Sequence, residues 1–255
     1  MCTVPDSSYY FLHLHKASGN SVISELYQKT TVQYVVCCEE CATKMIHNRS
    51  VLPISPRLFT FVRHPVDRVI SEFNYNIMLR ETYKSHQEVK EDVKLKEFSD
   101  FARSEGPYAK HRGARKGNIH FFNRLTGDLP TLLRSFWFVG ASEFFDSSMC
   151  ILLHKMGIPD RKRCACSART KTAFIHNDHQ VNHSISSSTI TADLRMRILN
   201  STKPDLELFE EGIALLLKEA DRLKHSTGIN FLCHDRPKLI KMVKGKHHGT
   251  ISAHK

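Results

Sequence analysis

The sequence predicts an α/β fold: a single domain with a central, mostly parallel sheet and helices on both faces. Strand-like apolar runs alternate with helix-like segments along the chain, and polar loops join each run to the segment that follows. The composition agrees with this expectation, because 41% of the 255 residues are hydrophobic and aromatic residues are spread along the chain.

The first two strand, loop and helix units lie in the first third of the chain. Residues 9–15 read as a strand, residues 16–21 as a small polar turn and residues 22–29 as a helix. A second buried strand covers residues 58–62, and Pro65 then occupies the favoured first position of a helix. Apolar residues recur in this helix at the spacing of one core face: Val66, Val69, Ile70, Phe73 and Ile77.

The second half of the chain continues the alternation. A third strand is expected at residues 136–139, and a helix follows from residues 140–143 to Met156. Residues 161–188 show no clear period and read as an extended loop or hairpin. A final helix begins at Pro204 and ends before Gly228.

The expected domain covers residues 7–235, and residues 236–255 form a basic, flexible tail. Lys and Arg outnumber Asp and Glu by 37 to 26, which gives a net charge of +11 and favours an anionic partner. No stretch approaches the roughly 18 consecutive apolar residues of a membrane span, and the N-terminus lacks the pattern of a signal peptide. The chain is therefore expected to be soluble.

Eight cysteines would permit disulfides in an oxidising compartment, although the spacing leaves the pairing open. A zinc site is the alternative, with Cys38 and Cys41 as one pair and Cys164, Cys166 or His47 as further ligands. Disulfides or buried thiols are favoured because no second pair stands at a familiar spacing, so no metal is expected. Three acceptor triplets for N-glycosylation suit a secretory protein: Asn48, Asn182 and Asn200.

The turn after the first strand is a candidate anion site. Small residues at a helix N-terminus present backbone N–H groups together with the positive end of the helix dipole, which favours phosphate or sulfate. Lys16 adds a point charge, but it precedes the glycine, unlike the lysine of nucleotide triphosphatases. The candidate residues are Lys16, Ala17, Ser18, Gly19, Asn20 and Ser21.

A second candidate anion site follows the second strand. Arg63 stands at the carboxyl end of that strand, where ligands of open α/β sheets collect, and a guanidinium can hold a phosphate with two parallel hydrogen bonds. Ser71 can add a hydroxyl donor. Each segment by itself is compatible with an ordinary surface role.

Taken together, the two segments resemble the donor site of sulfotransferases that use 3′-phosphoadenosine 5′-phosphosulfate (PAPS). The Lys-Ala-Ser-Gly-Asn-Ser turn at residues 16–21 resembles the P-loop-like loop that binds the 5′-phosphosulfate. The Arg-His-Pro-Val-Asp-Arg run at residues 63–68, with Ser71, resembles the segment that binds the 3′-phosphate. The nearest resemblance is to Golgi carbohydrate sulfotransferases of the heparan sulfate 2-O and 6-O type, and it spans about residues 9–225.

The first loop departs from the family pattern, which is usually Lys-Thr-Gly-Gly-Thr. Ala17, Ser18 and Asn20 replace one hydroxyl and one glycine and add other groups, while the backbone donors remain. An inactive member of the family is therefore an alternative to an active enzyme.

The resemblance also suggests the catalytic groups. Lys16 would neutralise the oxygen that bridges phosphate and sulfate as that bond breaks. His47, sixteen residues before Arg63, takes the place of the histidine base of the heparan 2-O type. Glu25, on the helix after the first loop, is the second candidate base.

The sequence thus predicts a PAPS-dependent O-sulfotransferase of the Golgi lumen that acts on a glycan. Its basic residues 110–116 would help to hold an acidic acceptor. A polyanion-binding or nucleic-acid-binding module is supported by net charge only, and a nucleic-acid partner is not expected because the usual interleaving of basic and aromatic residues is missing. A P-loop kinase is disfavoured because no Ser or Thr directly follows Lys16 to bind Mg²⁺.

Overall fold

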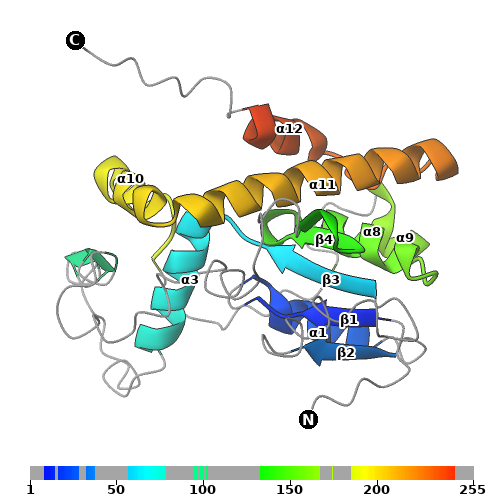
Figure 1. Ribbon diagram of the computed structural model, residues 1–255, viewed down its shortest axis with the longest axis horizontal. Coiled ribbons are helices and arrows are strands. Elements are labelled where there is room, and N and C mark those ends of the chain that lie inside the picture. Colours follow the sequence, from blue (N-terminus) through cyan, green and yellow to red (C-terminus); the bar gives the residue numbers. More distant parts are fainter. Residues whose placement is uncertain are drawn as a thin grey trace.

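A parallel sheet lies at the centre of the described residues, and helices pack around it (Figure 1). The computed structural model describes residues 9–14, 17–28, 33–37, 57–78, 95–96, 98–99, 102, 133–166, 174 and 185–244. In chain order the elements are β1 (Tyr9–Leu12), α1 (Gly19–Tyr27), β2 (Tyr34–Cys37), β3 (Arg57–Val62), α3 (Pro65–Met78), β4 (Phe138–Ala141), the 3₁₀ helix η3 (Ser142–Phe144), α8 (Phe145–Lys155), α9 (Arg161–Cys164), α10 (Ala192–Ser201), α11 (Lys203–Thr227) and α12 (Arg236–Lys244).

Four described strands form this sheet in the order β2-β1-β3-β4, and all three neighbouring pairs are parallel. β1 and β4 are buried along their whole length and β3 along all but its first residue, as expected for strands covered on both faces. The predicted α/β class and parallel sheet are confirmed. β2 is not predicted from the sequence, and it pairs along β1 from Tyr34 to Cys37.

The strand predicted at residues 136–139 lies two residues further on. β4 includes Gly140 and Ala141, which are in register with Phe61 and Val62 of β3. Pairing in the sheet therefore recruits residues whose local pattern indicates a turn. The helix that follows begins with η3, continues as α8 from Phe145 and ends at Lys155.

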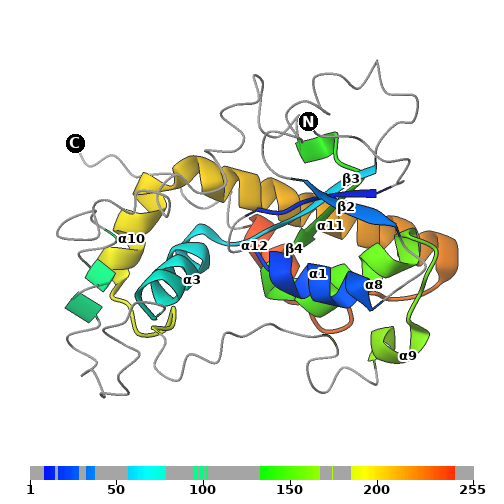
Figure 2. The ribbon, with the colours of Figure 1, turned by 90° about the horizontal axis from the view of Figure 1, so that it is seen from below.

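Helices α8 and α11 cover opposite faces of the sheet. On one face the ring of Phe145 in α8 lies 5.8 Å from that of Phe61. On the other face α11 comes so close that a Cβ on Gly212 would lie 2.6 Å from Cγ2 of Val62. Successive residues of a strand point to opposite faces, so these two contacts define the two layers. Figure 2 shows α1 on the same side of the strands as α8.

A second hydrophobic cluster joins α3 to α10. It buries apolar residues that were predicted to form one face of α3, namely Val66, Val69, Ile70 and Phe73. Leu194 and Ile198 of α10 complete the contact. α10 is not predicted from the sequence, although Thr191 caps it by accepting a hydrogen bond from the Leu194 amide.

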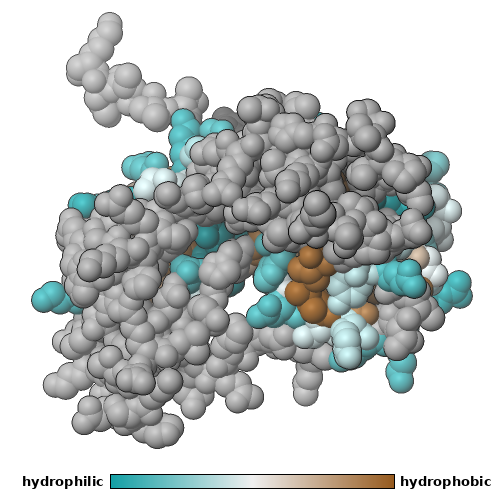
Figure 3. All heavy atoms as spheres, turned by 60° about the horizontal axis from the view of Figure 1, so that its bottom comes forward, coloured by the Kyte–Doolittle hydropathy of each residue, from teal (hydrophilic) through white to brown (hydrophobic). Residues whose placement is uncertain are grey.

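On the face drawn in Figure 3, the apolar surface of described residues is concentrated in one area among hydrophilic residues.

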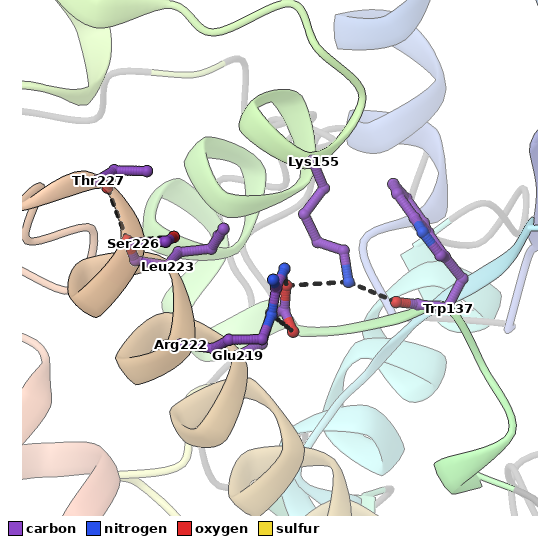
Figure 4. Close-up of polar contacts among 7 residues, drawn as sticks. All are labelled: Trp137, Lys155, Glu219, Arg222, Leu223, Ser226 and Thr227. Atoms are coloured by element: carbon purple, nitrogen blue, oxygen red, sulfur yellow. Dashed lines mark hydrogen bonds and ion pairs between the residues drawn. The ribbon is translucent and has the colours of Figure 1, made fainter.

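Lys155 joins α8, α11 and the approach to β4 (Figure 4). Its Nζ donates to the Trp137 carbonyl at 2.6 Å, pairs with Glu219 Oε1 at 3.0 Å and lies 4.6 Å from the centroid of the Trp137 ring. Burial lowers the pKa of Lys155, and the hydrogen bond and charge of Glu219 oppose that shift. Because Trp137 precedes β4, this cluster lies at the amino edge of the sheet.

Two disulfides hold the segment after α8, namely Cys150–Cys164 and Cys166–Cys233. The first disulfide ties α9 to α8. Because α9 is a helix, the prediction of an extended loop or hairpin over residues 161–188 is wrong at the beginning of that range. Cys164 and Cys166 are also not free to act as zinc ligands.

The chain after Arg236 is not wholly a flexible tail. Residues 236–244 form α12, which packs against α11 and buries Leu239 in the main core. Arg236 donates to both carboxylate oxygens of Asp221, which fixes the start of this helix on α11. Residues 245–255 lie outside the described residues. Among the described helices, none combines the length and apolar character needed to cross a membrane.

Candidate functional site

The carboxyl ends of β1, β3 and β4 meet at one edge of the sheet. In the register of the sheet Leu12 lies beside Thr60, and Val62 lies beside Ala141. The chain leaves β1 towards β2 on one side and leaves β3 towards β4 on the other. The boundary between β1 and β3 is therefore a topological switch point, where ligands of open α/β sheets bind.

The first predicted loop lies at this switch point. Ala17 and Ser18 form a turn, and Gly19 begins α1 three residues earlier than predicted. Gly19, Asn20 and Ser21 therefore form the first turn of α1, whose backbone amides carry the positive end of the helix dipole. Ala17, Gly19 and Ser21 are buried and Asn20 is exposed.

Two features show that this turn is tightly constrained. A Cβ on Gly19 would lie 1.8 Å from Cδ2 of His13, so a larger residue cannot occupy the position without moving the turn. Ser18 adopts a left-handed φ of 60°, which costs an L-residue about 1–2 kcal/mol and is often found at ligand-binding turns. Lys16, predicted to bind and neutralise the anion, lies outside the described residues.

The second predicted segment begins at the adjacent strand end. Arg63 directly follows β3, His64 comes next, and Pro65 begins α3 as predicted. The side chains of Arg63 and Ser71 are both half-buried. The structure thus brings the turn at residues 17–21 and Arg63 to neighbouring strand ends.

Contacts from η3 and α11 fix the turn after Arg63. The His64 amide donates to Glu143 Oε1 at 2.7 Å, and the His64 ring meets the edge of Phe209 in α11 at 5.3 Å between centroids. Arg68 and Asp205, both buried, form an ion pair at 3.6 Å that joins α3 to α11. Neither Glu143 nor Asp205 was assigned a role from the sequence, although Glu143 comes just after a predicted strand and Asp205 stands at the start of a predicted helix.

Burial controls the charge state of this edge. Burial raises the pKa of Glu143 to about 7, opposed by the His64 amide and by the positive charge of Arg63. Burial also lowers the pKa of His64, and Asp67 acts in the opposite direction. A carboxyl group that titrates near neutrality therefore stands beside the predicted phosphate-binding arginine.

Glu25, the second candidate base, is fully buried and already paired. Its Oε2 accepts a hydrogen bond from Arg163 Nη1 at 2.8 Å, and Arg163 is anchored to α8 through the neighbouring disulfide of Cys164. A general base must contact the acceptor hydroxyl. A buried carboxylate that is paired with a guanidinium is poorly placed to make that contact. His47, the first candidate base, lies outside the described residues, and so do the basic residues 110–116.

Comparison with known proteins identifies the family. The described part of the chain holds no group of three or more His, Cys, Asp or Glu side chains arranged as a metal site. Searches of curated proteins and of solved structures found no match. The model of the sulfotransferase family matches residues 31–210, which include Arg63, Ser71, Glu143 and Asp205 and make up more than half of the chain. The chain therefore belongs to the sulfotransferase family.

Proposed function

We propose that this chain is a PAPS-dependent O-sulfotransferase that transfers a sulfuryl group to a hydroxyl of a glycan. The family match carries the proposal, because it includes the Arg63 segment at the switch point of the sheet. The oxygen of the acceptor forms a bond to sulfur, and the bond from sulfur to the 5′-phosphate oxygen breaks. The acceptor proton passes to a base, and adenosine 3′,5′-bisphosphate leaves.

The donor would be held by the two anion sites. The turn from Lys16 to Ser21 would bind the 5′-phosphosulfate through backbone amides at the start of α1, as a P-loop-like loop, and Lys16 would neutralise the departing oxygen. Support comes from the lack of room for a side chain at Gly19 and from the left-handed conformation of Ser18. Arg63 and Ser71 would bind the 3′-phosphate.

The acceptor side of the proposal rests on charge. The net charge of +11 and the basic residues 110–116 favour an acidic glycan over a neutral acceptor. His47 remains the proposed base. The burial of Glu25 against Arg163 supports this order of the two candidates.

The Golgi lumen is the proposed location. Two disulfides among the described residues are typical of proteins that fold in an oxidising compartment. Asn200, one of the three predicted glycosylation acceptors, is exposed on α10.

Calorimetry with adenosine 3′,5′-bisphosphate tests the donor site. We expect Arg63→Ala to weaken binding roughly 10- to 100-fold, because it removes a charge-assisted contact worth about 1.5–3 kcal/mol. Arg57→Ala is the matched control, since Arg57 lies at the opposite end of the same strand and donates to the Tyr9 hydroxyl. Equal affinities of a folded Arg63→Ala variant and the wild type would remove Arg63 from the donor site.

Ligand preference and transfer assays separate the alternatives. The bisphosphate should raise the melting temperature more than ATP with Mg²⁺ or DNA does. Stabilisation by DNA or other polyanions without a response to the bisphosphate would favour a polyanion-binding module. Binding of the bisphosphate without sulfate transfer to heparan, chondroitin or galactosides would favour an inactive member of the family.

A further inference from the structure

Three buried polar atoms at the carboxyl ends of β3 and β4 have no hydrogen-bond partner among the described residues. They are Ser142 Oγ, Glu143 Oε2 and His64 Nδ1, and the last of these lies 3.9 Å from Asp67 Oδ2. Buried polar atoms are nearly always hydrogen-bonded, so such a group at one strand edge indicates that a polar ligand completes it. The Glu143 carboxyl is the acid of this group and directly contacts the backbone of the Arg63–His64 turn.

Each oxygen of Glu143 has a different environment. Oε1 accepts the His64 amide hydrogen bond at 2.7 Å, so it fixes the backbone immediately after Arg63. Oε2 is buried and has no partner in the described part of the chain. The charged groups that act on Glu143 are Arg63 and Asp67, and Arg195 of α10 acts in turn on the His64 imidazole.

This arrangement creates a conflict when an anion binds at Arg63. A carboxylate and a phosphate that share one partly buried site repel each other, and the usual resolution is that one of them carries a proton. A protonated Glu143 would keep Oε1 as the acceptor of the His64 amide. Its Oε2 would then present an O–H donor in place of a negative charge.

We propose that Glu143 is a positioning residue of the donor site, which holds the Arg63–His64 turn and takes up one proton from solvent when the 3′-phosphate of the donor binds. The proposal rests on the function proposed above. The pKa of Glu143, raised by burial to about 7 before any ligand is present, makes this uptake easy near neutral pH.

The affinity of the wild-type protein for adenosine 3′,5′-bisphosphate should therefore depend on pH. If only the form protonated at Glu143 binds, the dissociation constant should rise about tenfold from pH 6 to pH 8. The second ionisation of a phosphate, near pH 6, acts in the opposite direction in the lower part of this range. Glu143→Gln keeps an oxygen acceptor for the His64 amide but does not titrate, so its affinity should lack the loss at high pH.

Calorimetric titration at pH 7.5 in two buffers of different ionisation enthalpy counts the protons taken up. We expect roughly 0.5–1 proton per bisphosphate bound for the wild type and close to none for Glu143→Gln. Glu207→Gln, an exposed carboxyl on α11, is the control that should retain the wild-type uptake. Glu143→Ala, which also loses the acceptor for the His64 amide, should bind more weakly than Glu143→Gln at every pH.

His64→Asn tests the neighbouring titratable group, because the substitution keeps the backbone amide that contacts Glu143. The His64→Asn variant should retain the proton uptake. If His64→Asn loses the proton uptake and Glu143→Gln retains it, the proposal is overturned. If Glu143→Gln does not fold, the wild type and His64→Asn still decide. Binding by the wild type without proton uptake would overturn this proposal only. No binding of the bisphosphate at any pH would overturn the proposed function as well.

Discussion

Glu25 shows that burial and pairing determine what a carboxylate can do. The residue stands on the helix that follows the candidate donor loop, which makes it a reasonable base from its position in the sequence. In the fold it is fully buried and ion-paired with Arg163 at 2.8 Å. A structural role for Glu25 follows, and it can be separated from catalysis by mutation.

We predict that His47→Ala and Glu25→Gln affect different quantities. His47→Ala should lower kcat by roughly 10²–10⁴-fold with little change in donor affinity, the usual effect of losing a general base. Glu25→Gln should instead lower the free energy of unfolding by about 1–3 kcal/mol, because Arg163 loses its charged partner. Transfer kinetics and denaturant unfolding measure the two effects. A large fall in kcat for Glu25→Gln alone would make Glu25 the base.

The pKa of Glu143 also predicts how stability depends on pH. The folded-state pKa of about 7 lies above the ordinary value of 4.5, so folding takes up a proton between these values. The contribution of Glu143 to stability is therefore present below about pH 4.5 and is lost as pH rises to about 7. Glu143→Gln should accordingly raise the free energy of unfolding more at pH 8 than at pH 5, by roughly 2 kcal/mol. Urea titrations at the two pH values check this, and an equal gain at both would contradict it.

At the scale of elements, α3 carries Ser71 and begins two residues after Arg63, the other predicted 3′-phosphate contact. A buried ion pair joins α3 to α11. Arg68 of α3 and Asp205 of α11 are 2% and 0% exposed, so neither charge is screened by water. Burial lowers the pKa of Arg68, and Asp205 and Glu72 oppose this shift. Such a pair is a weak source of net stability, but breaking it leaves an uncompensated buried charge.

Asp205→Asn should therefore destabilise the protein by about 3 kcal/mol and weaken donor binding through movement of α3. Asp193→Asn on α10 is the matched control, because Asp193 is 71% exposed and pairs with Arg197. That change should cost less than about 1 kcal/mol. Thermal unfolding and calorimetry with the bisphosphate measure the two effects. Equal melting temperatures for both variants would show that the buried pair does not hold α3.

At the scale of the whole molecule, disulfides connect parts of the chain that are distant in sequence. Cys166 and Cys233 are separated by 67 residues, and their bond ties the segment after α9 to the segment before α12. Cys150 and Cys164 are separated by 14 residues and attach α9, with Arg163, to α8. Through Arg163 and Glu25 the second link reaches α1 and the candidate donor loop.

Removing the two disulfides should lower the free energy of unfolding by unequal amounts. In the loop-entropy description, replacing Cys166 and Cys233 by Ser should cost about 4 kcal/mol, and replacing Cys150 and Cys164 about 3 kcal/mol. Guanidinium unfolding of the two double variants measures the difference. A reducing agent should lower the free energy of unfolding of each double variant by less than it lowers that of the wild type. Wild-type stability that does not change on reduction would contradict both assignments.

Local patterns predicted much of the sheet and its main helices. β1, β3, α3 and α11 follow from short apolar runs, from Pro65 at a helix start and from Gly228 at a helix end, because each signal acts within a few residues. β2 was not predicted although its sequence, Tyr-Val-Val-Cys, is apolar. α10 is rich in polar groups and α12 lies in a basic stretch, so the local patterns of these two helices are weak. These three elements are stabilised chiefly by packing against their neighbours.

The candidate site divides in the same way. The sequence by itself determined which residue types follow the strands. The binding of an anion by residues 16–21 and Arg63 was predicted from these residue types, and it stays a prediction, as do the roles of Lys16 and His47. Only the tertiary structure decided that Glu143 contacts the His64 amide, 79 residues away, and that Glu25 faces Arg163, 138 residues away. It also decided the cysteine pairing. The physical reason is that periodicity specifies which face of an element is buried, whereas the partner on that face depends on how distant elements pack.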